Sequence, residues 1–598
     1  MDRNLIMAIV LSMAVLLGWE LLVATPQREA MEATRAEQAA RQAEAGVEMS
    51  GPELGELVEA EVPVDVTDAL AKSPARVRVK TSTLEGSINL KGGALDDLVL
   101  MQYRETVDPE SAPIRLLSPA ETEHGHYVLQ GWAVGRDTGA RETWQAPEGA
   151  VLTPSTPVTL TRTTGDLTFE KTIAVDEKYM FTVTQKVTNN GAEPLAIRSY
   201  ATVTQRNIPE DYRNFMILHE GPLGVIGKTL YERKYDKLRK NKDRKVAESG
   251  IGGWVGITNK NWLAAAIPPA DAQIEATLMN RGTADKPVFE AFYFMPAETL
   301  APGQSTSHTS YVFGGPKDVD LLQSYEAKPE DGGLGVYDFD KAVDWGHLFF
   351  LTRPIFYTLN FFGDLIGNFG VAILILTLII KLILFPVANK GYESMSKMKK
   401  LQPEIKKLQE RHTDDKVKLQ QEMMALYKKE NMNPLAGCFP ILLQMPIFYA
   451  LYKVLFVTIE LRHQPFLYIS DLSAQDPTTI FNLFGLLPYD PTALPMIGAF
   501  LGIGFLPLFM GVAMWFQMKL NPPPADPMQA QIFGLMPFIF VFIFAPFAAG
   551  LVLYWFWNTT LGIFQQWYIM KKNGVKVELG ERLKLPWVKK KPAAGDAK

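Results

Sequence analysis

The residue best able to act chemically is a lysine inside an apolar run. Lys381 lies in the stretch 373–385, where every other residue except Thr377 is apolar. A charge among lipid tails costs at least about 2.5–3.5 kcal/mol on insertion scales, so it normally faces a cavity or a partner. Lys381 is also five residues from Pro386, about 7.5 Å along a helix, and could instead reach the membrane surface. Both interpretations remain open at this point.

The polar residues in neighbouring apolar stretches are all neutral. They are Thr377, Gln444, Gln517, Asn558, Thr559 and Thr560. No acidic residue lies deep in those stretches, which argues against a proton relay or a buried ion pair. Each neutral residue could bond helix to helix instead of lining a cavity. An unpaired cation among neutral groups implies water, so we expect a wet pocket in the inner leaflet if Lys381 does not reach the surface.

Other kinds of chemistry find no support in the sequence. The single cysteine, Cys438, excludes an intramolecular disulfide, and the seven histidines complete no metal-ligand set. We find no phosphate-binding loop, no supported Ser/His/Asp constellation and no zincin helix. The sequence therefore predicts no cofactor, no metal and no covalent catalysis.

Five predicted membrane spans would position the polar residues. They cover 366–385, 434–458, 494–518, 532–546 and 550–569, with Asn433 and Pro434 as the N-cap and first residue of the second. The aromatic stretch 340–363 is too interrupted to span and predicts an amphipathic helix lying on the membrane. These spans and the loops between them form an expected five-span core over residues 364–570.

The amino-terminal half has a different character. Residues 1–24 contain about 20 apolar positions and predict an uncleaved signal-anchor helix, which brings the expected spans to six. Residues 25–74 are expected to form a flexible tether. In 75–335, alternating segments separated by turn residues predict a large antiparallel β-sandwich. The segments are 76–80, 158–162, 167–171, 181–185 and 289–293, and the turns include 91–93, 189–191 and 302–303.

Loop charges set the expected orientation. The loop 387–432 carries 11 Lys and Arg residues and the tail 571–598 carries nine, whereas 459–491 carries one. Because cytoplasmic loops are enriched in Lys and Arg, the tail and the loop 387–432 are expected in the cytoplasm. Six spans then place both termini in the cytoplasm and the β-domain outside. This arrangement fits a bacterial inner membrane and its periplasm.

The loop 387–432 predicts a helical hairpin rich in methionine. Met395 and Met398 begin a helical apolar face, and Met423 and Met424 lie on the second helix. Methionine suits an adaptable contact surface, although these residues could simply hold the two helices together. The tail residues 589–591, all lysine, could meet anionic lipid or ribosomal RNA.

Long ordered blocks of the chain closely resemble the YidC membrane protein insertases, relatives of the mitochondrial oxidase-assembly and chloroplast Albino insertases. The blocks are Ser394-Met-Ser-Lys-Met398, Leu401-Gln402-Pro403, Gln421–Tyr427, Asn433–Phe448, Phe466–Pro477 and Gly550–Tyr554. The match spans roughly 340–572, and the order of parts in 1–340 resembles the Gram-negative type.

The resemblance implies an insertase and chaperone for integral inner-membrane proteins, working alone or with the Sec translocon. It implies a hydrophilic groove open to the cytoplasm, with a cation that attracts the acidic tail of the substrate. The position of the family arginine is occupied here by Lys381, which keeps the charge but loses the bidentate fork. Tyr554, Trp555 and Met445 are expected to contact the substrate helix.

Partners implied by the resemblance are nascent membrane proteins, the Sec translocon, the ribosome at the hairpin and basic tail, and membrane lipids, but not DNA. Two rival functions remain. A solute transporter with Lys381 as an anion site would call for inverted repeats and paired broken helices, which we do not find. A periplasmic sensor would bind a ligand in the β-domain and signal through the hairpin.

Overall fold

The computed structural model describes residues 63–575, with gaps at 74, 136, 213, 215–216, 241–244, 413–414, 431–438, 488, 490, 495–497 and 522–526. The predicted anchor 1–24, most of the tether 25–74, the N-cap pair Asn433 and Pro434, and the tail beyond 575 lie outside the described residues. Within the expected tether, 66–72 is a short helix, α3 (Val66–Lys72), because Asp65 caps it by accepting from the backbone N–H of Thr67.

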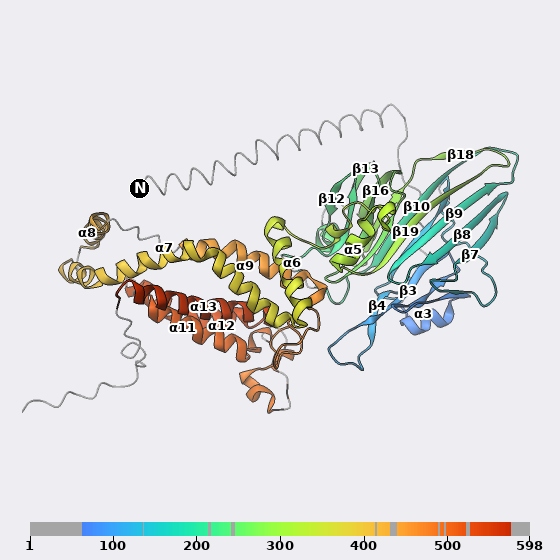
Figure 1. The fold of residues 1–598 in the computed structure, drawn as a ribbon. Helices are drawn as coiled ribbons and strands as arrows, with labels where there is room; N and C mark the ends of the chain where they lie inside the picture. The colour runs from blue at the N-terminus through green and yellow to red at the C-terminus, as the bar shows by residue number, and fades with distance from the viewer. Residues whose placement is uncertain are drawn as a thin grey trace, which may run out of the picture. The chain divides into compact units, whose positions relative to one another are not determined.

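The β-domain consists of two sheets (Figure 1). The first has the order β13-β16-β17-β10-β5-β3-β2-β1-β6, with β18 paired to β10 and β4 paired to β3. Its strands are β1 (Arg76–Lys80), β2 (Leu84–Asn89), β3 (Ala94–Arg104), β4 (Pro113–Leu117), β5 (His126–Val134), β6 (Val151–Leu152), β10 (Leu195–Arg206), β13 (Lys245–Ile251), β16 (Gln273–Asn280), β17 (Val288–Phe294) and β18 (Glu298–Leu300).

The second sheet has the order β12-β11-β14-β15-β19-β9-β8-β7. Its strands are β7 (Val158–Thr164), β8 (Leu167–Val175), β9 (Met180–Asn189), β11 (Gly221–Ile226), β12 (Thr229–Glu232), β14 (Gly253–Thr258), β15 (Trp262–Ile267) and β19 (Ser305–Pro316). Short helices α4 (Tyr235–Lys240) and α5 (Val319–Glu326) flank the strands. All paired strands are antiparallel except β1 and β6, which run parallel.

The predicted alternating segments all lie in strands. In β8, buried and half-buried residues alternate from Leu167 to Val175, as expected for a strand with one face on the core. The predicted turn at 91–93 joins β2 to β3, and Gly92 and Gly93 there have φ of 74° and 62°, which glycine adopts without strain. The sandwich prediction is therefore confirmed at the level of its strands and turns.

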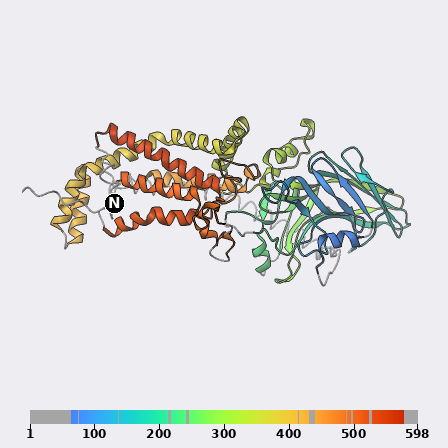
Figure 2. The same cartoon turned by 90° about the horizontal axis from the view of Figure 1, so that it is seen from below.

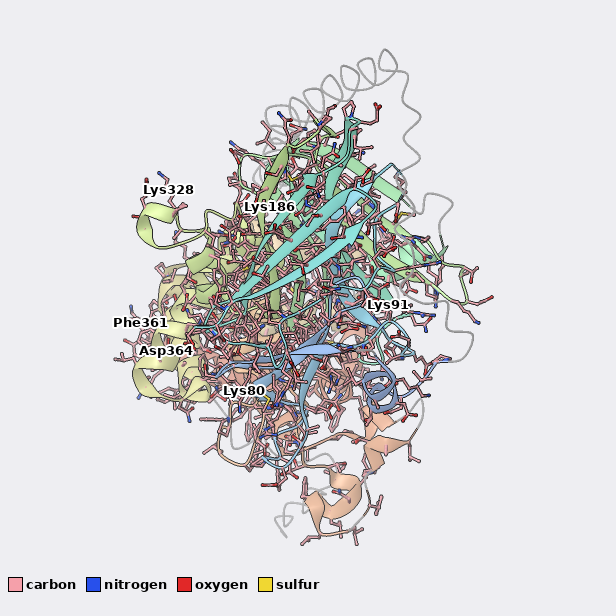
Figure 3. The ribbon with its side chains drawn as sticks, turned by 90° about the vertical axis from the view of Figure 1, so that its right-hand side faces the viewer. Lys80, Lys91, Lys186, Lys328, Phe361 and Asp364 are labelled. Atoms are coloured by element: carbon pink, nitrogen blue, oxygen red, sulfur yellow. The ribbon has the colours of Figure 1, made fainter. Side chains whose placement is uncertain are left out.

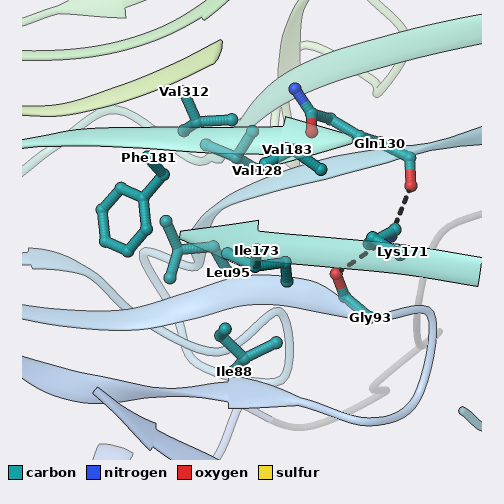
Figure 4. A pocket seen from close by; sticks show the side chains of 10 residues that line it. All are labelled: Ile88, Gly93, Leu95, Val128, Gln130, Lys171, Ile173, Phe181, Val183 and Val312. Atoms are coloured by element: carbon teal, nitrogen blue, oxygen red, sulfur yellow. Dashed lines mark hydrogen bonds between the residues drawn. The ribbon is translucent and has the colours of Figure 1, made fainter. Parts of the chain in front are cut away.

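One inward position of β8 is a lysine. Lys171 is 1% exposed, and its Nζ donates to the carbonyl oxygens of Gln130 at 2.7 Å and Gly93 at 3.3 Å (Figure 4). It lines a cavity of about 30 Å³ between the sheets, together with apolar residues of β2, β3, β5, β9 and β19. That volume holds about two water molecules and no sugar-sized ligand.

The helical region begins with α6 (Phe349–Ile366) after a short turn of helix, η3 (Phe339–Ala342). Its other elements are α7 (Phe369–Arg411), α8 (Lys416–Lys429), α9 (Phe439–Val457), η5 (Ile459–Leu461), η6 (Ile480–Gly485), η7 (Pro491–Ala493), α10 (Gly498–Leu501), α11 (Phe505–Leu520), α12 (Pro527–Phe544) and α13 (Ala549–Lys572). Helix α13 packs against α7, α9 and α11, and α6 packs against α7 and α9 (Figures 1 and 2).

Helix α6 begins later and ends later than the predicted range 340–363. Its inner face carries Thr352, Ile355, Phe356, Leu359 and Gly363, which are buried. Its outer face is apolar too, since large side chains there are exposed, and Phe361 and Asp364 project from it in Figure 3. A helix with an apolar outer face next to a packed inner face fits a membrane surface.

Two helices have ends that differ from those of the predicted spans. The first predicted span ends at residue 385, but α7 continues through Pro386 and Pro403 as one helix of 43 residues, because proline bends a helix without always ending it. The third predicted span starts at residue 494, but α11 starts at Phe505. Among the described residues one helix, α7, has the length and hydropathy of a membrane span, beside the shorter apolar stretches Gln444–Val457, Phe505–Leu520 and Ala530–Phe544.

Burial of Lys171 predicts a pH-dependent stability of the β-domain. Burial, with a smaller contribution from Arg162, lowers the pKa of Lys171 from 10.5 to about 7. Between these values the unfolded chain holds the proton and the folded chain does not, so stability rises with pH over about pH 7–10.5. We expect Lys171→Met to remove this rise, measured as the temperature at which the β-domain of the full-length protein becomes protease-sensitive.

Lys186→Met on β9 is the matched control, because Lys186 is 44% exposed and paired with Glu170 on the surface (Figure 3). This variant should keep the pH dependence of the unchanged protein. An identical pH dependence in Lys171→Met and the unchanged protein would contradict the assignment.

Candidate functional site

Lys381 lies where three helices converge. A Cβ built on Gly562 of α13 would lie 3.5 Å from Nζ of Lys381, 3.0 Å from Nε2 of Gln517 on α11 and 3.7 Å from the hydroxyl oxygen of Tyr392 on α7. The Gln517 side chain also hydrogen-bonds the Tyr392 hydroxyl. The missing side chain at Gly562 thus leaves room for a lysine, an amide and a phenol to meet. We call these four residues the Lys381 cluster.

The Lys381 cluster contains no counter-charge. Helices α9, α11, α12 and α13, and α7 up to Tyr392, carry no Asp or Glu. Within the described part of the chain, no carboxylate lies within salt-bridge distance of Lys381, whose side chain is half-buried. A half-buried ammonium without a carboxylate needs neutral hydrogen-bond acceptors or water. The hydroxyl of Tyr392 and the amide of Gln517 are the neutral polar groups nearest to it around Gly562.

A second polar contact joins α9 to α13. The Gln444 amide donates to the hydroxyl of Tyr554, whose side chain is fully buried. Tyr554 therefore faces α9 inside the bundle rather than the outside of α13. Its neighbour Trp555 packs edge-on against Phe448 at 4.9 Å and also contacts Phe544. Met445, one residue beyond Gln444, is 55% exposed and is the open member of this predicted contact group.

Among the described residues, no hydrogen bond joins the other predicted groove residues to Lys381. Thr377 is fully buried and its hydroxyl donates to the carbonyl of Ile373 in its own helix. Thr560 bonds Phe556 in the same way. Asn558 is buried with its side-chain oxygen unpaired among the described residues. The structure thus places Gln517 beside Lys381.

The loop 471–477 fixes the ends of two of the helices that form the site. Asp476 accepts from the backbone N–H of Leu506 at 2.9 Å and from the hydroxyl of Tyr468 at 2.9 Å. Thr478, just after the loop, accepts from the N–H of Phe505, so α11 starts there and not at residue 494. The carbonyls of Ala474 and Leu472 accept from the N–H groups of Ala549 and Gly550, the first residues of α13.

The cytoplasmic hairpin prediction corresponds to the second half of α7 and to α8. Met424 is 56% exposed, while Met395, Met398 and Met423 are half-buried. Met424 is therefore open to a partner, while the other three are partly covered. Asp415 caps α8 by accepting from the backbone N–H of Lys418.

Sequence reasoning missed two residues of this region. Tyr392 was overlooked because it follows the apolar stretch, and it comes near Gly562 and Lys381 only when α7 continues past Pro386. Lys453 was overlooked because lysines were counted in loops, although it stands between Tyr452 and Val454 in an apolar helix. Its side chain is 3% exposed and pairs with Asp344 at 2.6 Å. The lysine inside the apolar sequence of α9 was the signal that could have identified this site.

The comparisons with known proteins agree with this arrangement of a β-domain followed by helices. The chain matches the family described as the YidC periplasmic domain over residues 76–358 and the family described as the 60Kd inner membrane protein over residues 361–576. It is 46% identical to a "Membrane protein insertase YidC" of Nitrobacter hamburgensis, over 98% of this chain and 97% of that protein. A relative of the same name from Caulobacter vibrioides is also 46% identical, over 96% of each chain.

Among solved structures, the chain is similar to an active YidC insertase with its first transmembrane domain resolved. That similarity has 18% identity and a TM-score of 0.36, over 83% of this chain and 93% of the other. The matched families define an inner membrane protein with a periplasmic domain. The chain belongs to the YidC family of membrane protein insertases, which confirms the resemblance predicted from the sequence. The relatives are named for insertion, so the family is not one of enzymes.

The proximity of Gly562 to the Lys381 ammonium gives a test of whether water reaches position 381 on this side. In a Cys438→Ala background, Lys381→Cys should react with a water-soluble maleimide in the purified, membrane-embedded protein. Adding Gly562→Leu should slow labelling by at least about tenfold, which corresponds to roughly 1.4 kcal/mol, because the new side chain fills the space.

Gly534→Leu on α12 is the control, since a Cβ there meets nothing within 4 Å. It should leave labelling unchanged. Equal labelling in the Gly562→Leu and Gly534→Leu proteins would show that position 381 does not face this space.

Proposed function

We propose that the chain inserts integral proteins into the bacterial inner membrane through a hydrophilic groove at the Lys381 cluster, and assists their folding and assembly. The observation that carries this proposal is the convergence of Lys381, Gln517 and Tyr392 on Gly562. Family membership supports insertion as the activity, and the absence of carboxylates from these helices supports a site that is hydrated rather than locked by an ion pair.

The proposed topology has six spans. Residues 1–24 supply the first, and α7, α9, α10–α11, α12 and α13 supply the others. The basic second half of α7, the basic α8 and the basic tail face the cytoplasm under the positive-inside rule. Both termini are then cytoplasmic. The 43 residues of α7 amount to about 65 Å of helix, about twice the apolar thickness of a bilayer, so its second half extends into the cytoplasm.

The ammonium of Lys381 acts by attracting carboxylates of the translocated tail. Two unit charges 4 Å apart attract by about 1 kcal/mol in bulk water and about 4 kcal/mol at an effective dielectric of about 20. A tail entering the groove also crosses a shorter apolar path, which reduces the cost of moving its polar residues. Lysine provides a point charge, so this attraction is transient and needs no bidentate geometry.

The apolar part of the substrate slides along the outside of α9 and α13. Met445 is exposed for such contact. Tyr554 supports the contact from inside by holding Gln444, while Trp555 joins α9, α12 and α13 through its aromatic neighbours. In this proposal Tyr554 and Trp555 shape the surface more than they touch the substrate.

We further propose the partners that the family resemblance implies. Met424 of α8 and the basic tail offer an apolar and a cationic contact for the ribosome and for lipid headgroups. Insertion proceeds alone or with the Sec translocon. No covalent step is involved, and the energy comes from burying the apolar segment of the substrate in the bilayer.

Removing the charge tests the proposal. Lys381→Ala should reduce insertion of a substrate with an acidic translocated tail by roughly ten- to a hundredfold in reconstituted vesicles, matching an electrostatic loss of about 1–3 kcal/mol. Insertion of the same substrate with a neutral tail should change little. Protease protection of the translocated tail is the measurement.

Lys381→Arg is the matched control, because it keeps the charge and should insert both substrates. Full insertion of the acidic-tailed substrate by Lys381→Ala would reject the role of the charge.

A further inference from the structure

Helix α9 contains a lysine that, unlike Lys381, has a carboxylate partner. Nζ of Lys453 lies 2.6 Å from Oδ2 of Asp344, and the two side chains are 3% and 17% exposed. Lys453 also donates to the carbonyl of Ile217. The pair joins α9 to the segment that leads into α6.

Two backbone N–H groups hold the Asp344 carboxylate in place, in addition to Lys453. Its Oδ1 accepts from the N–H of Gly346 at 3.1 Å and its Oδ2 accepts from the N–H of His219 at 2.8 Å. Burial alone would raise the pKa of Asp344, but the Lys453 ammonium and the His219 N–H outweigh it and hold that pKa below its ordinary value. Asp344 is therefore a fixed anion facing a buried cation.

The segment around Asp344 is rigidly joined to the start of α6. Thr352, in the first turn of the helix, donates its hydroxyl to the carbonyl of Trp345 at 2.9 Å. Trp345 donates its ring N–H to the carbonyl of Asp340 at 3.2 Å, and Arg353 pairs with the Asp340 carboxylate at 2.8 Å. We call residues 340–353 the α6 entry segment. These bonds make α6 move together with Asp344.

The rest of α6 has contacts that constrain it less. Its inner face packs on α7 and α9 through apolar side chains, and its outer face is apolar and exposed, including Phe349, Phe350 and Phe361. Apolar burial is non-directional, so it favours a helix at the membrane surface without fixing where the helix lies along α9. Tyr357 of α6 accepts a hydrogen bond from Gln323 of α5 at 2.7 Å. A buried ion pair with preset hydrogen bonds adds a directional constraint toward α9.

Helix α9 carries the pair at one end and the groove contact at the other. Lys453 lies nine residues after Gln444, which is two and a half turns and hence the opposite face. We propose that Asp344 and Lys453 form a positioning pair that fixes α6 against α9 and so sets the place of α9 beside Tyr554 for insertion. This inference rests on the proposed insertase function.

The test uses variants that separate the pair from its charges. Lys453→Met and Asp344→Asn each leave one member of the pair without the other, Lys453→Met with Asp344→Asn removes both charges, and Lys453→Arg keeps the pair. A charge swap is unsuitable because Lys317 is also electrostatically coupled to Asp344. Lys328→Met is the matched control, since Lys328 is 74% exposed on the surface (Figure 3).

Two measurements are made on full-length protein in vesicles. One is insertion of a membrane protein substrate, followed by protease protection. The other is the spin-label distance between Phe361→Cys on α6 and Phe538→Cys on α12 in a Cys438→Ala background, because both side chains are more than half exposed, at 62% and 61%. The distance reports the position of α6 relative to α12. A variant that is only less stable would keep this distance in the molecules that remain folded.

We expect a single narrow distance in the unchanged protein, in Lys453→Arg and in Lys328→Met. Lys453→Met and Asp344→Asn should broaden the distance and reduce insertion by at least about tenfold, as a misplaced binding element does. If neither single variant accumulates in the membrane, the test uses Lys453→Met with Asp344→Asn. This double variant should accumulate, with a broadened distance and reduced insertion.

A narrow distance together with full insertion in the variants would overturn the positioning pair while leaving the insertase proposal intact. A broadened distance with full insertion would also overturn it. Failure of the unchanged protein to insert any substrate would instead reject the proposed function.

Discussion

The helical region depends on how a half-buried ammonium without a carboxylate is kept solvated. Lys381 cannot be neutralised by its neighbours, because α9, α11, α12 and α13 carry no acidic residue. Its surroundings therefore have to offer neutral oxygen atoms or water, and the amide of Gln517 and the hydroxyl of Tyr392 lie beside it around Gly562. The contrast with Lys453 is informative, because that lysine is paired and nearly closed off. In our account the paired lysine holds the scaffold and the unpaired one serves the substrate.

The position of the open site follows from contacts distant in the sequence. Residues 471–477 tie the starts of α11 and α13 together, so Gln517 and Gly562 face Lys381 from helices that are held at a common end. Gln444 and Tyr554 then join α9 to α13. The helices that surround the Lys381 cluster are thus tied together at the 471–477 end. This arrangement suits the proposed site, which must bind a substrate polypeptide while its helices stay packed.

Much of the architecture could be predicted from local patterns. Alternation located the strands, as in β8, and the positions of Gly92 and Gly93 located a turn. The charged residue in the apolar run directed attention to Lys381. The start of α11 could not be predicted, because it is set by Asp476, thirty residues earlier in the chain. The burial of Tyr554 also depends on helix packing, which hydropathy does not encode.

Contact between the site and a polypeptide in transit is the central claim. A photo-crosslinker placed at Lys381, at Met445 and, as a lipid-facing control, at Phe538 would be used with a ribosome-stalled membrane protein. Our account predicts crosslinks from position 381 to the polar tail and from position 445 to the apolar segment, with few from position 538. Crosslinks to the nascent chain at 445 and 538 but none at 381 would contradict the claim.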